Sequence, residues 1–325
     1  MDMHLHDITK NLESDTIRKG FGEGLKKLGE TDDKVVALCA DLTGSTNMNF
    51  FADVFPDRFF QVGIAEQNLV TVGSGLAAVG FIPFVSSYAA FSPGRNWEQI
   101  RTTVCLNNQP VKIIGSHAGL SVGPDGATHQ MLEDIALMRS LPNMVVIVPC
   151  DKNEAYKATL ALGADKRPGY LRLAREPVPI ITSDETPFEI GKAYVYDEGR
   201  DLTVISTGTM TYLALKVASN LYKDGIDVEV IHCPTIKPLD SETILKSVKK
   251  TGAVITCEEA QINGGLGGAI AELLGENHPV PLRRIGVEDR FGESGDPEEL
   301  FEHFGLTTKH IEKTAHDLMK QLGRT

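Results

Sequence analysis

The residues best suited to chemistry are polar side chains that stand directly after short apolar runs. Such runs predict buried parallel strands, and ligands bind outside the carboxyl ends of parallel strands. The set combines acids, imidazoles, hydroxyls and a guanidinium: Asp41, Ser45, Glu66, Tyr88, His117, Asp125, His129 and Arg175. Each one alone could be a solvated loop residue. At corresponding ends of five predicted strands, the set indicates one binding or catalytic site.

Glu66 is the most unusual member of this set. Residues 60–88 read as strand, turn, helix and strand, and the helical stretch, 69–79, is rich in Gly and Ala. Many small residues allow a helix to lie close to its neighbours, so we expect this helix to be buried. A buried carboxylate at its start costs free energy unless it has a partner. The sequence offers no obvious partner for Glu66.

A glycine-rich loop, HAGLSVGPDGATHQ at residues 117–130, carries two of the candidate histidines. Its glycines permit positive φ angles, so the loop can fold tightly and present backbone N–H groups. His117 and His129 bracket the loop and can act as acid, base or hydrogen-bond donor near neutral pH. A metal pair is disfavoured because no Cys or third His is nearby. A turn whose histidines cap a strand and a helix is the structural alternative.

Around these residues the chain alternates apolar strands with helices, which predicts α/β architecture with parallel sheets covered on both faces. A proline-rich stretch, 175–192, interrupts the alternation and is the predicted linker. We therefore expect two doubly wound domains, a mostly parallel-sheet domain at 1–182 and a smaller α/β domain at 190–325. The predicted strands are 34–40, 60–62, 81–85, 111–116, 144–148, 170–173, 202–206, 228–232, 253–257 and 282–285. The predicted helices include 16–29, 69–79, 96–107, 132–139, 153–162, 212–223, 241–248 and 266–274.

Composition excludes several classes of function. The formal net charge is -12 and the pI is near 5.2, which argues against nucleic acid as the main partner. No apolar run reaches about 18 residues, so no membrane span is expected. The N-terminus lacks the pattern of a secretory signal. Five widely spaced cysteines predict buried thiols in a reducing cytoplasm, and no zinc site.

Several motifs together resemble the C-terminal half of a transketolase, a family of thiamine-diphosphate enzymes. They are IRKG (17–20), ADLTGSTN (40–47), VGIAEQN (62–68), GLAAVGFIPF (75–84), SHAGLSVGPDGATHQ (116–130) and LPNMVVIVPCDKNE (141–154). Their order and spacing match nearly the whole chain. The resemblance implies a pyrimidine-binding domain followed by a transketolase C-terminal domain.

The resemblance also implies roles for individual residues. Glu66 would hydrogen-bond the aminopyrimidine of thiamine diphosphate, and we expect burial to keep it protonated even though a helix start favours the ionised form. Tyr88 and Phe91 match aromatic residues that pack on the pyrimidine. A third aromatic position is Gly94 here, so the aromatic wall would be thinner or completed by Trp97.

Other positions match cofactor or substrate contacts. Asp41 matches an acid near the thiazolium side of the cofactor. Asp125 matches a residue that binds a substrate hydroxyl, and His129 one near the reacting end of the donor. Residues matching the sugar-phosphate site are Arg18, Ser45, His117 and Arg175, and two guanidiniums suit a phosphate well. Alternatively, Arg18 is a helix-surface charge and Arg175 pairs with Glu176.

The motif that anchors the diphosphate through Mg²⁺ in this family, GDG followed by Asn, has no complete match. The near match, Gly295-Asp296-Pro297, is not followed by the rest of the motif. We therefore expect the second subunit of a split enzyme, with an N-terminal subunit that supplies the Mg²⁺ and diphosphate site. The expected assembly is a heterotetramer with two copies of each chain. The run INGGLGGAI (262–270) lacks the Lys and Ser/Thr of a P-loop and is interpreted as close packing.

The expected reaction is transfer of a two-carbon ketol unit between phosphorylated sugars. Three alternatives remain. A deoxyxylulose-phosphate synthase fragment would share IAEQ and DGATH, but that family tends to carry Arg where His117 stands. A β subunit of a 2-oxo acid dehydrogenase would not need the paired Arg18 and Arg175. A non-catalytic homologue would not need an unpaired buried acid at Glu66.

Overall fold

A seven-stranded sheet organises the first half of the chain in the computed structural model, which describes residues 3–324. Neighbouring strands are parallel except at one edge, where β12 from the second half pairs antiparallel with β6. In spatial order the strands are β12 (Thr235–Lys237), β6 (Val145–Ile147), β7 (Gly169–Arg172), β5 (Lys112–Ser116), β4 (Ile82–Tyr88), β2 (Val35–Cys39) and β3 (Phe59–Gln61).

Helices cover both faces of this sheet, as expected for a doubly wound fold. Alternate side chains of β2 belong to different hydrophobic clusters, with Val36 in one and Val35 in the other. On the Val35 face lie α1 (Ile17–Thr31) and α6 (Lys152–Ala164). On the Val36 face lie α3 (Glu66–Ala78), the short α4 (Trp97–Gln99) with its π-helical continuation (Ile100–Cys105), and α5 (Asp134–Arg139). A short helix, α2 (Asn49–Ala52), precedes β3.

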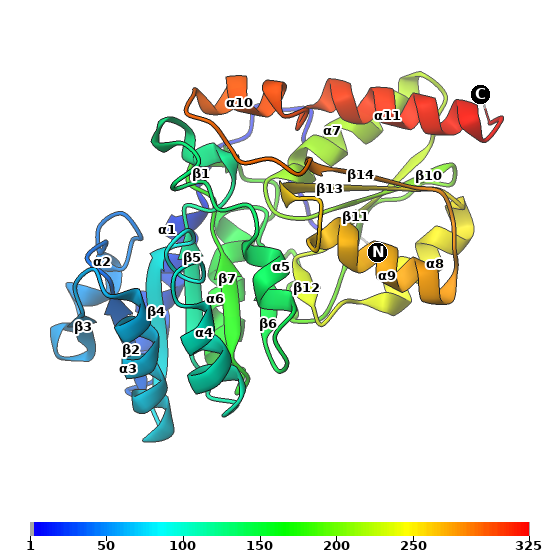
Figure 1. Cartoon of the computed structure of the whole chain (residues 1–325). Helices are drawn as coiled ribbons and strands as arrows, with labels where there is room; N and C mark the ends of the chain where they lie inside the picture. The colour runs from blue at the N-terminus through cyan, green and yellow to red at the C-terminus, as the bar shows by residue number, and fades with distance from the viewer. Residues whose placement is uncertain (1–2, 325) are drawn as a thin grey trace.

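The second half forms a five-stranded sheet in which only β9, among the described strands, runs antiparallel. The spatial order is β14 (Leu282–Val287), β13 (Val254–Gln261), β10 (Leu202–Ser206), β11 (Val228–His232) and β9 (Tyr194–Asp197). Its helices are α7 (Met210–Lys223), α8 (Ser241–Thr251), α9 (Leu266–Asn277), α10 (Pro297–His303) and α11 (Thr308–Gln321). Figure 1 shows this sheet and its helices beside the first. The predicted fold class is confirmed.

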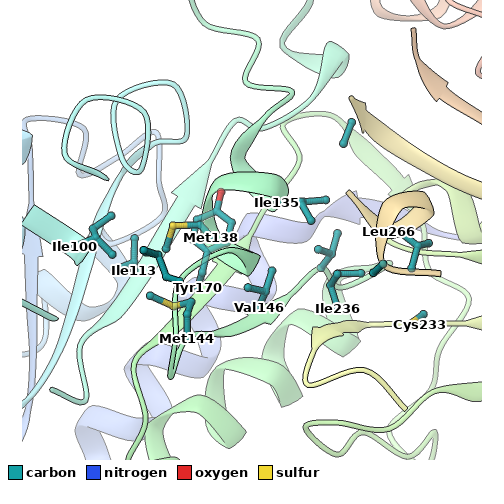
Figure 2. Close-up of a cluster of buried hydrophobic side chains, with 14 of the residues drawn as sticks. Ile100, Ile113, Ile135, Met138, Met144, Val146, Tyr170, Cys233, Ile236 and Leu266 are labelled. Carbon is teal, nitrogen blue, oxygen red and sulfur yellow. The ribbon is translucent and has the colours of Figure 1, made fainter. Parts of the chain in front are cut away.

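The two halves share a continuous core. Figure 2 shows Ile113 and Tyr170 of the first sheet in one hydrophobic cluster with Ile236 and Leu266 of the second half. The irregular N-terminal arm packs Met3, Leu5, Ile8 and Leu12 against the second half. In the linker, β8 (Pro177–Pro179) pairs with β1 (Ser14–Thr16). Because each half contributes segments to the other, the boundaries 1–182 and 190–325 stay a prediction.

Three local expectations are wrong. Helix α1 does not stop at Gly29, which faces Phe51 and Phe55, and continues to Thr31. The predicted helix 96–107 is a short α-helix followed by a π-helical turn. Helix α3 is not buried all round, because no described element covers its outer side. The apolar residues left exposed there and on its flanks, which we call the α3 apolar face, are Phe60, Ile64, Val72, Val79 and Phe81.

No helix between residues 3 and 324 combines the length and the apolar character needed to cross a membrane.

Candidate active site

Glu66 lies at the first position of α3 with 1% of its surface exposed. Its Oε2 accepts a hydrogen bond from the Arg95 guanidinium at 2.7 Å, and its Oε1 lies 3.4 Å from the Ser87 hydroxyl. The Glu66 carbonyl accepts from the Asn96 side-chain amide at 2.8 Å. The expectation of an unpaired acid is therefore wrong, because the loop after β4 brings a cation to the carboxylate. The same contact weakens the argument that a non-catalytic homologue would not need this acid.

Four rings gather from two separate segments of the chain, one at the end of β4 and one after β5. Tyr88 at the end of β4 stacks on Phe91, with centroids 6.2 Å apart and planes 21° apart. His117, which directly follows β5, stacks on Tyr88 with ring centroids 3.9 Å apart. His129 meets Phe91 edge-on at 5.4 Å. The structure thus brings together four residues that the sequence assigned to one site.

Of the two expected alternatives, the structure rules out completion of the aromatic wall by Trp97 and leaves the thinner wall. The Trp97 indole N–H donates to the Leu137 carbonyl at 3.0 Å, and its ring packs against the hydrophobic core instead. Gly94 has no room for a larger residue, because an added Cβ would lie 2.1 Å from the Ala90 carbonyl oxygen. The guanidinium of Arg95 covers Phe91, with its central carbon 4.7 Å from the ring centroid.

His117 is a neutral imidazole. Burial, followed by the positive charges of Arg18 and Arg175 and the nearby His129, lowers the pKa of His117 to about 3. Its Nδ1 lies 2.9 Å from the Ser116 hydroxyl, and its backbone φ of 56° is in the left-handed region. His117 can therefore donate or accept a hydrogen bond at physiological pH, but it is not charged there. This excludes roles that need a charged imidazole.

Two arginine side chains lie close enough to His117 for their charges to lower its pKa. Arg18 on α1 donates to the carbonyl of Arg175 at 3.0 Å and to the carbonyl of Ser45, while its Nε is buried without a partner. Arg175 donates to the Val122 carbonyl, and its contact with Glu176 is long, at 3.7 Å. Burial lowers the pKa of Arg18 from its ordinary value. Arg18 is thus not a simple surface charge, and the pair retains capacity for an anion.

The remaining predicted residues lie at the rim. Asp41 is exposed, with φ at 61°, and its N–H donates to the Gln61 side chain at 2.9 Å. Ser45 is exposed and contacts Arg18 only through its carbonyl. Asp125 is also exposed, and its carboxylate makes no contact with the other predicted site residues of the described chain. The structure therefore does not join Asp125 to the cluster.

The second half of the chain holds the glycine-rich loop in place. Glu259 at the end of β13 accepts from the Ser121 N–H at 2.9 Å and from the Thr209 hydroxyl at 2.8 Å. An added Cβ at Gly119 would lie 2.2 Å from a Glu259 carboxylate oxygen, so this glycine is required for the close approach. Gln130 donates to the Glu293 carbonyl at 2.9 Å. Sequence reasoning missed Glu259, because its neighbours in sequence give no sign of this contact.

The INGGLGGAI segment forms the N-terminus of α9, and its amides bind a carboxylate of the same chain. Leu266 and Gly267 donate their N–H groups to Glu258 at 2.7 and 2.8 Å. Burial raises the pKa of Glu258 to about 7. Because the Glu258 carboxylate already binds these two amides, the segment offers no open phosphate cradle. Its interpretation as internal packing therefore holds.

One group of potential metal ligands lies within the described residues, although none was predicted. Ligand atoms of Cys150, Glu154 and His232 lie within 4.8 Å of one another and are buried. The Glu154 carboxylate already accepts from the Cys150 N–H at 2.7 Å and pairs with His232 Nε2 at 2.8 Å. His232 Nδ1 contacts the Thr211 hydroxyl at 2.8 Å. These bonds link the two halves of the chain and leave little capacity for an ion.

Comparison with known proteins agrees with this architecture. Residues 14–180 match the family model of the transketolase pyrimidine-binding domain, and residues 191–311 match that of the transketolase C-terminal domain. The chain therefore belongs to the transketolase family. It is similar to subunits of transketolases built from more than one chain, as the following relatives show. The prediction that the chain is a transketolase-type transferase subunit is therefore confirmed.

Two curated relatives and one solved structure illustrate the similarity. A 6-deoxy-6-sulfo-D-fructose transketolase subunit of Clostridium is 42% identical over 95% of this chain and 96% of its own length. An apulose-4-phosphate transketolase subunit of Phocaeicola vulgatus is 38% identical over 94% of this chain and 97% of its own length. A solved split-gene transketolase, described as an inactive beta4 tetramer, has 43% identity and a TM-score of 0.87 over 93% of this chain and 97% of its own.

Proposed function

We propose that the chain is the C-terminal subunit of a thiamine-diphosphate-dependent transketolase that transfers a two-carbon ketol unit between phosphorylated sugars. The observation that carries this proposal is the buried Glu66 carboxylate, which Arg95 connects to the Phe91 ring and so to the stacked Tyr88. The neighbouring Arg18 and Arg175 guanidiniums add a site for an anionic group. Both named relatives act on sugars that carry such a group, one a sulfonate and one a phosphate.

The residues present fit the aminopyrimidine half of the cofactor. A buried carboxyl group in its protonated form can donate a hydrogen bond to a ring nitrogen, and the Phe91 and Tyr88 rings offer apolar faces for a flat heterocycle. Asp41 would lie toward the thiazolium side. When bound, thiamine diphosphate supplies the nucleophilic carbon that the reaction needs, and Mg²⁺ with the diphosphate site would come from the partner subunit.

The substrate would be held by the chain's own side chains. Arg18, Arg175 and Ser45 would bind the sugar phosphate, with two guanidiniums matching its geometry. His117, neutral because of its lowered pKa, would hydrogen-bond the sugar without contributing charge. His129 would lie at the reacting end of the donor. Asp125 would bind a substrate hydroxyl only if its exposed loop position is brought inward.

An N-terminal subunit that completes the site is supported by the α3 apolar face. Ile64 and Val79 are each 74% exposed, although they flank the helix that begins with the buried Glu66. Apolar residues left exposed on and around one helix offer a surface that a partner chain can cover. We propose that the assembly contains two copies of each chain. The inactivity stated for the solved beta4 relative agrees with a need for a second type of chain. Five buried free thiols support a cytoplasmic location.

The test is to purify this chain alone and together with a candidate N-terminal subunit that carries GDG and a downstream Asn. Ketol transfer between phosphorylated sugars is then measured with thiamine diphosphate and Mg²⁺. Activity is expected only from the pair, and Glu66→Ala is expected to remove it. Activity of this chain alone would refute the two-subunit proposal. A wild-type rate in the Glu66→Ala complex would refute the role of Glu66.

A further inference from the structure

Arg95 makes two contacts in the candidate site that no sequence argument assigned. Its Nη1 donates to Glu66 Oε2 at 2.7 Å, and its central carbon lies 4.7 Å from the centroid of the Phe91 ring. The Arg95 side chain is 48% exposed, whereas Glu66 is 1% exposed. One guanidinium at the mouth of the site therefore joins the buried carboxylate to the aromatic wall.

The Glu66 carboxylate and the Phe91 ring are two of the groups that the proposed function assigns to binding of the aminopyrimidine. A guanidinium and an aminopyrimidine are both flat, so they suit the same ring face. Both also bond the Glu66 carboxyl group, the guanidinium through an N–H and the aminopyrimidine through its ring nitrogen. A single carboxylate oxygen and a single ring face cannot hold both in the same place. The contacts of Arg95 therefore compete with those expected of the cofactor.

We propose that Arg95 occupies the aminopyrimidine position in the cofactor-free chain and must release Glu66 before the cofactor can bind. The inference rests on the proposed function. In the free chain, Arg95 is a positioning residue that keeps Glu66 from being an unpaired buried charge, which would be costly. When Arg95 turns away, Glu66 becomes available to the ring nitrogen of the cofactor.

The local structure permits this exchange without refolding of the loop. Because half of the Arg95 side chain is already exposed, the guanidinium can turn into solvent. The next residue, Asn96, is buried and fixes the loop through bonds to the Glu66 carbonyl at 2.8 Å and the Ser92 hydroxyl at 3.1 Å. The side chain of Arg95 can therefore move while the backbone beside Glu66 stays in place.

The competition has a measurable consequence for affinity. A ligand that binds only when Arg95 is displaced loses affinity in proportion to the fraction of chains in that state. A hydrogen bond between charged groups at a partly exposed position corresponds to about a tenfold effect. Removing the guanidinium should therefore tighten binding of an aminopyrimidine by about tenfold.

The experiment titrates 4-amino-5-hydroxymethyl-2-methylpyrimidine, the ring fragment of the cofactor, into the full chain. Calorimetry gives the affinity, and the fluorescence of Trp97, the only tryptophan of the chain, reports on the loop two residues from Arg95. The variants are Arg95→Ala, Arg95→Met and Arg95→Lys. Arg200→Ala, at an 80% exposed arginine between β9 and β10, is the control for loss of one positive charge. Circular dichroism checks that each variant is folded.

Arg95→Ala and Arg95→Met are expected to bind the fragment about tenfold more tightly than wild type. Arg200→Ala should match wild type, and Arg95→Lys, which keeps a cation for Glu66, should stay nearer to wild type than to Arg95→Ala. Equal or weaker binding by Arg95→Ala and Arg95→Met would overturn the inference and leave the proposed function standing. Binding by none of the proteins would contradict the pyrimidine site itself, and the inference with it.

Discussion

Replacing Asp134 by Asn should destabilise the chain strongly, because this residue neutralises a buried cation that supports the site. Asp134 and Arg172 are 0% and 4% exposed, and Arg172 Nε donates to Asp134 Oδ2 at 2.8 Å. The same oxygen accepts from the Tyr170 hydroxyl at 2.6 Å. Arg172 also donates to the Glu259 carbonyl at 2.8 Å, which ties this pair to the residue that holds the glycine-rich loop.

The expected loss of stability in Asp134→Asn comes from the Arg172 charge that the substitution leaves behind. Asn keeps the shape of Asp134 but leaves the Arg172 charge buried without a counter-ion, which costs about 3–5 kcal/mol in unfolding free energy. The matched control is Glu272→Gln, which breaks the Arg139–Glu272 pair. Because Glu272 is 64% exposed, solvent screens that pair and its loss should cost no more than about 1 kcal/mol.

The assay is urea unfolding followed by circular dichroism, with the midpoint and slope determined for wild type and both variants. A shift of the midpoint at unchanged slope reports a change in stability. If Asp134→Asn loses no more stability than Glu272→Gln, the Arg172–Asp134 ion pair does not contribute the expected free energy of unfolding. In that case the bonds from Arg172 to backbone carbonyls would be sufficient to hold its charge.

Three further predictions concern the site and its supports. Arg175→Ala in the reconstituted enzyme should raise the KM for a phosphorylated ketose about tenfold with little change in kcat, and an equal effect on an unphosphorylated ketose would contradict the phosphate role. His117, with a pKa of about 3, should show no titration by NMR between pH 5 and 8, and a shift in that window would show that it gains charge there. Because the folded-state pKa of Glu258 is raised from 4.5 to about 7, the folded chain retains a proton that the unfolded chain has lost, so this group should lower the unfolding free energy by about 3 kcal/mol as pH rises across that window. Urea unfolding of Glu258→Gln should lack this part of the pH dependence, and an unchanged profile would refute it.

Much of the architecture was predictable from the sequence because the signals are local. Fully apolar runs such as those of β2 and β6 are typical of buried parallel strands, and they lie where they were expected. The rule that ligands gather at strand ends selected Tyr88 and His117, which stack on each other, and Glu66, which contacts Ser87 on the same strand as Tyr88. The short strands β1, β8, β9 and β12 were not predicted, because their few residues carry no periodic pattern.

The sequence by itself determined the α/β alternation, the family motifs and the strand-end residues of the site. Only the tertiary structure decided which distant polar groups meet: Arg95 pairs with Glu66 across 29 positions, and Glu259 accepts from the Ser121 N–H across 138. It also decided that Trp97 faces the core and that one side of α3 stays uncovered. Hydrophobic periodicity is a property of neighbouring residues, whereas a buried ion pair depends on distant segments that meet only after the chain has folded.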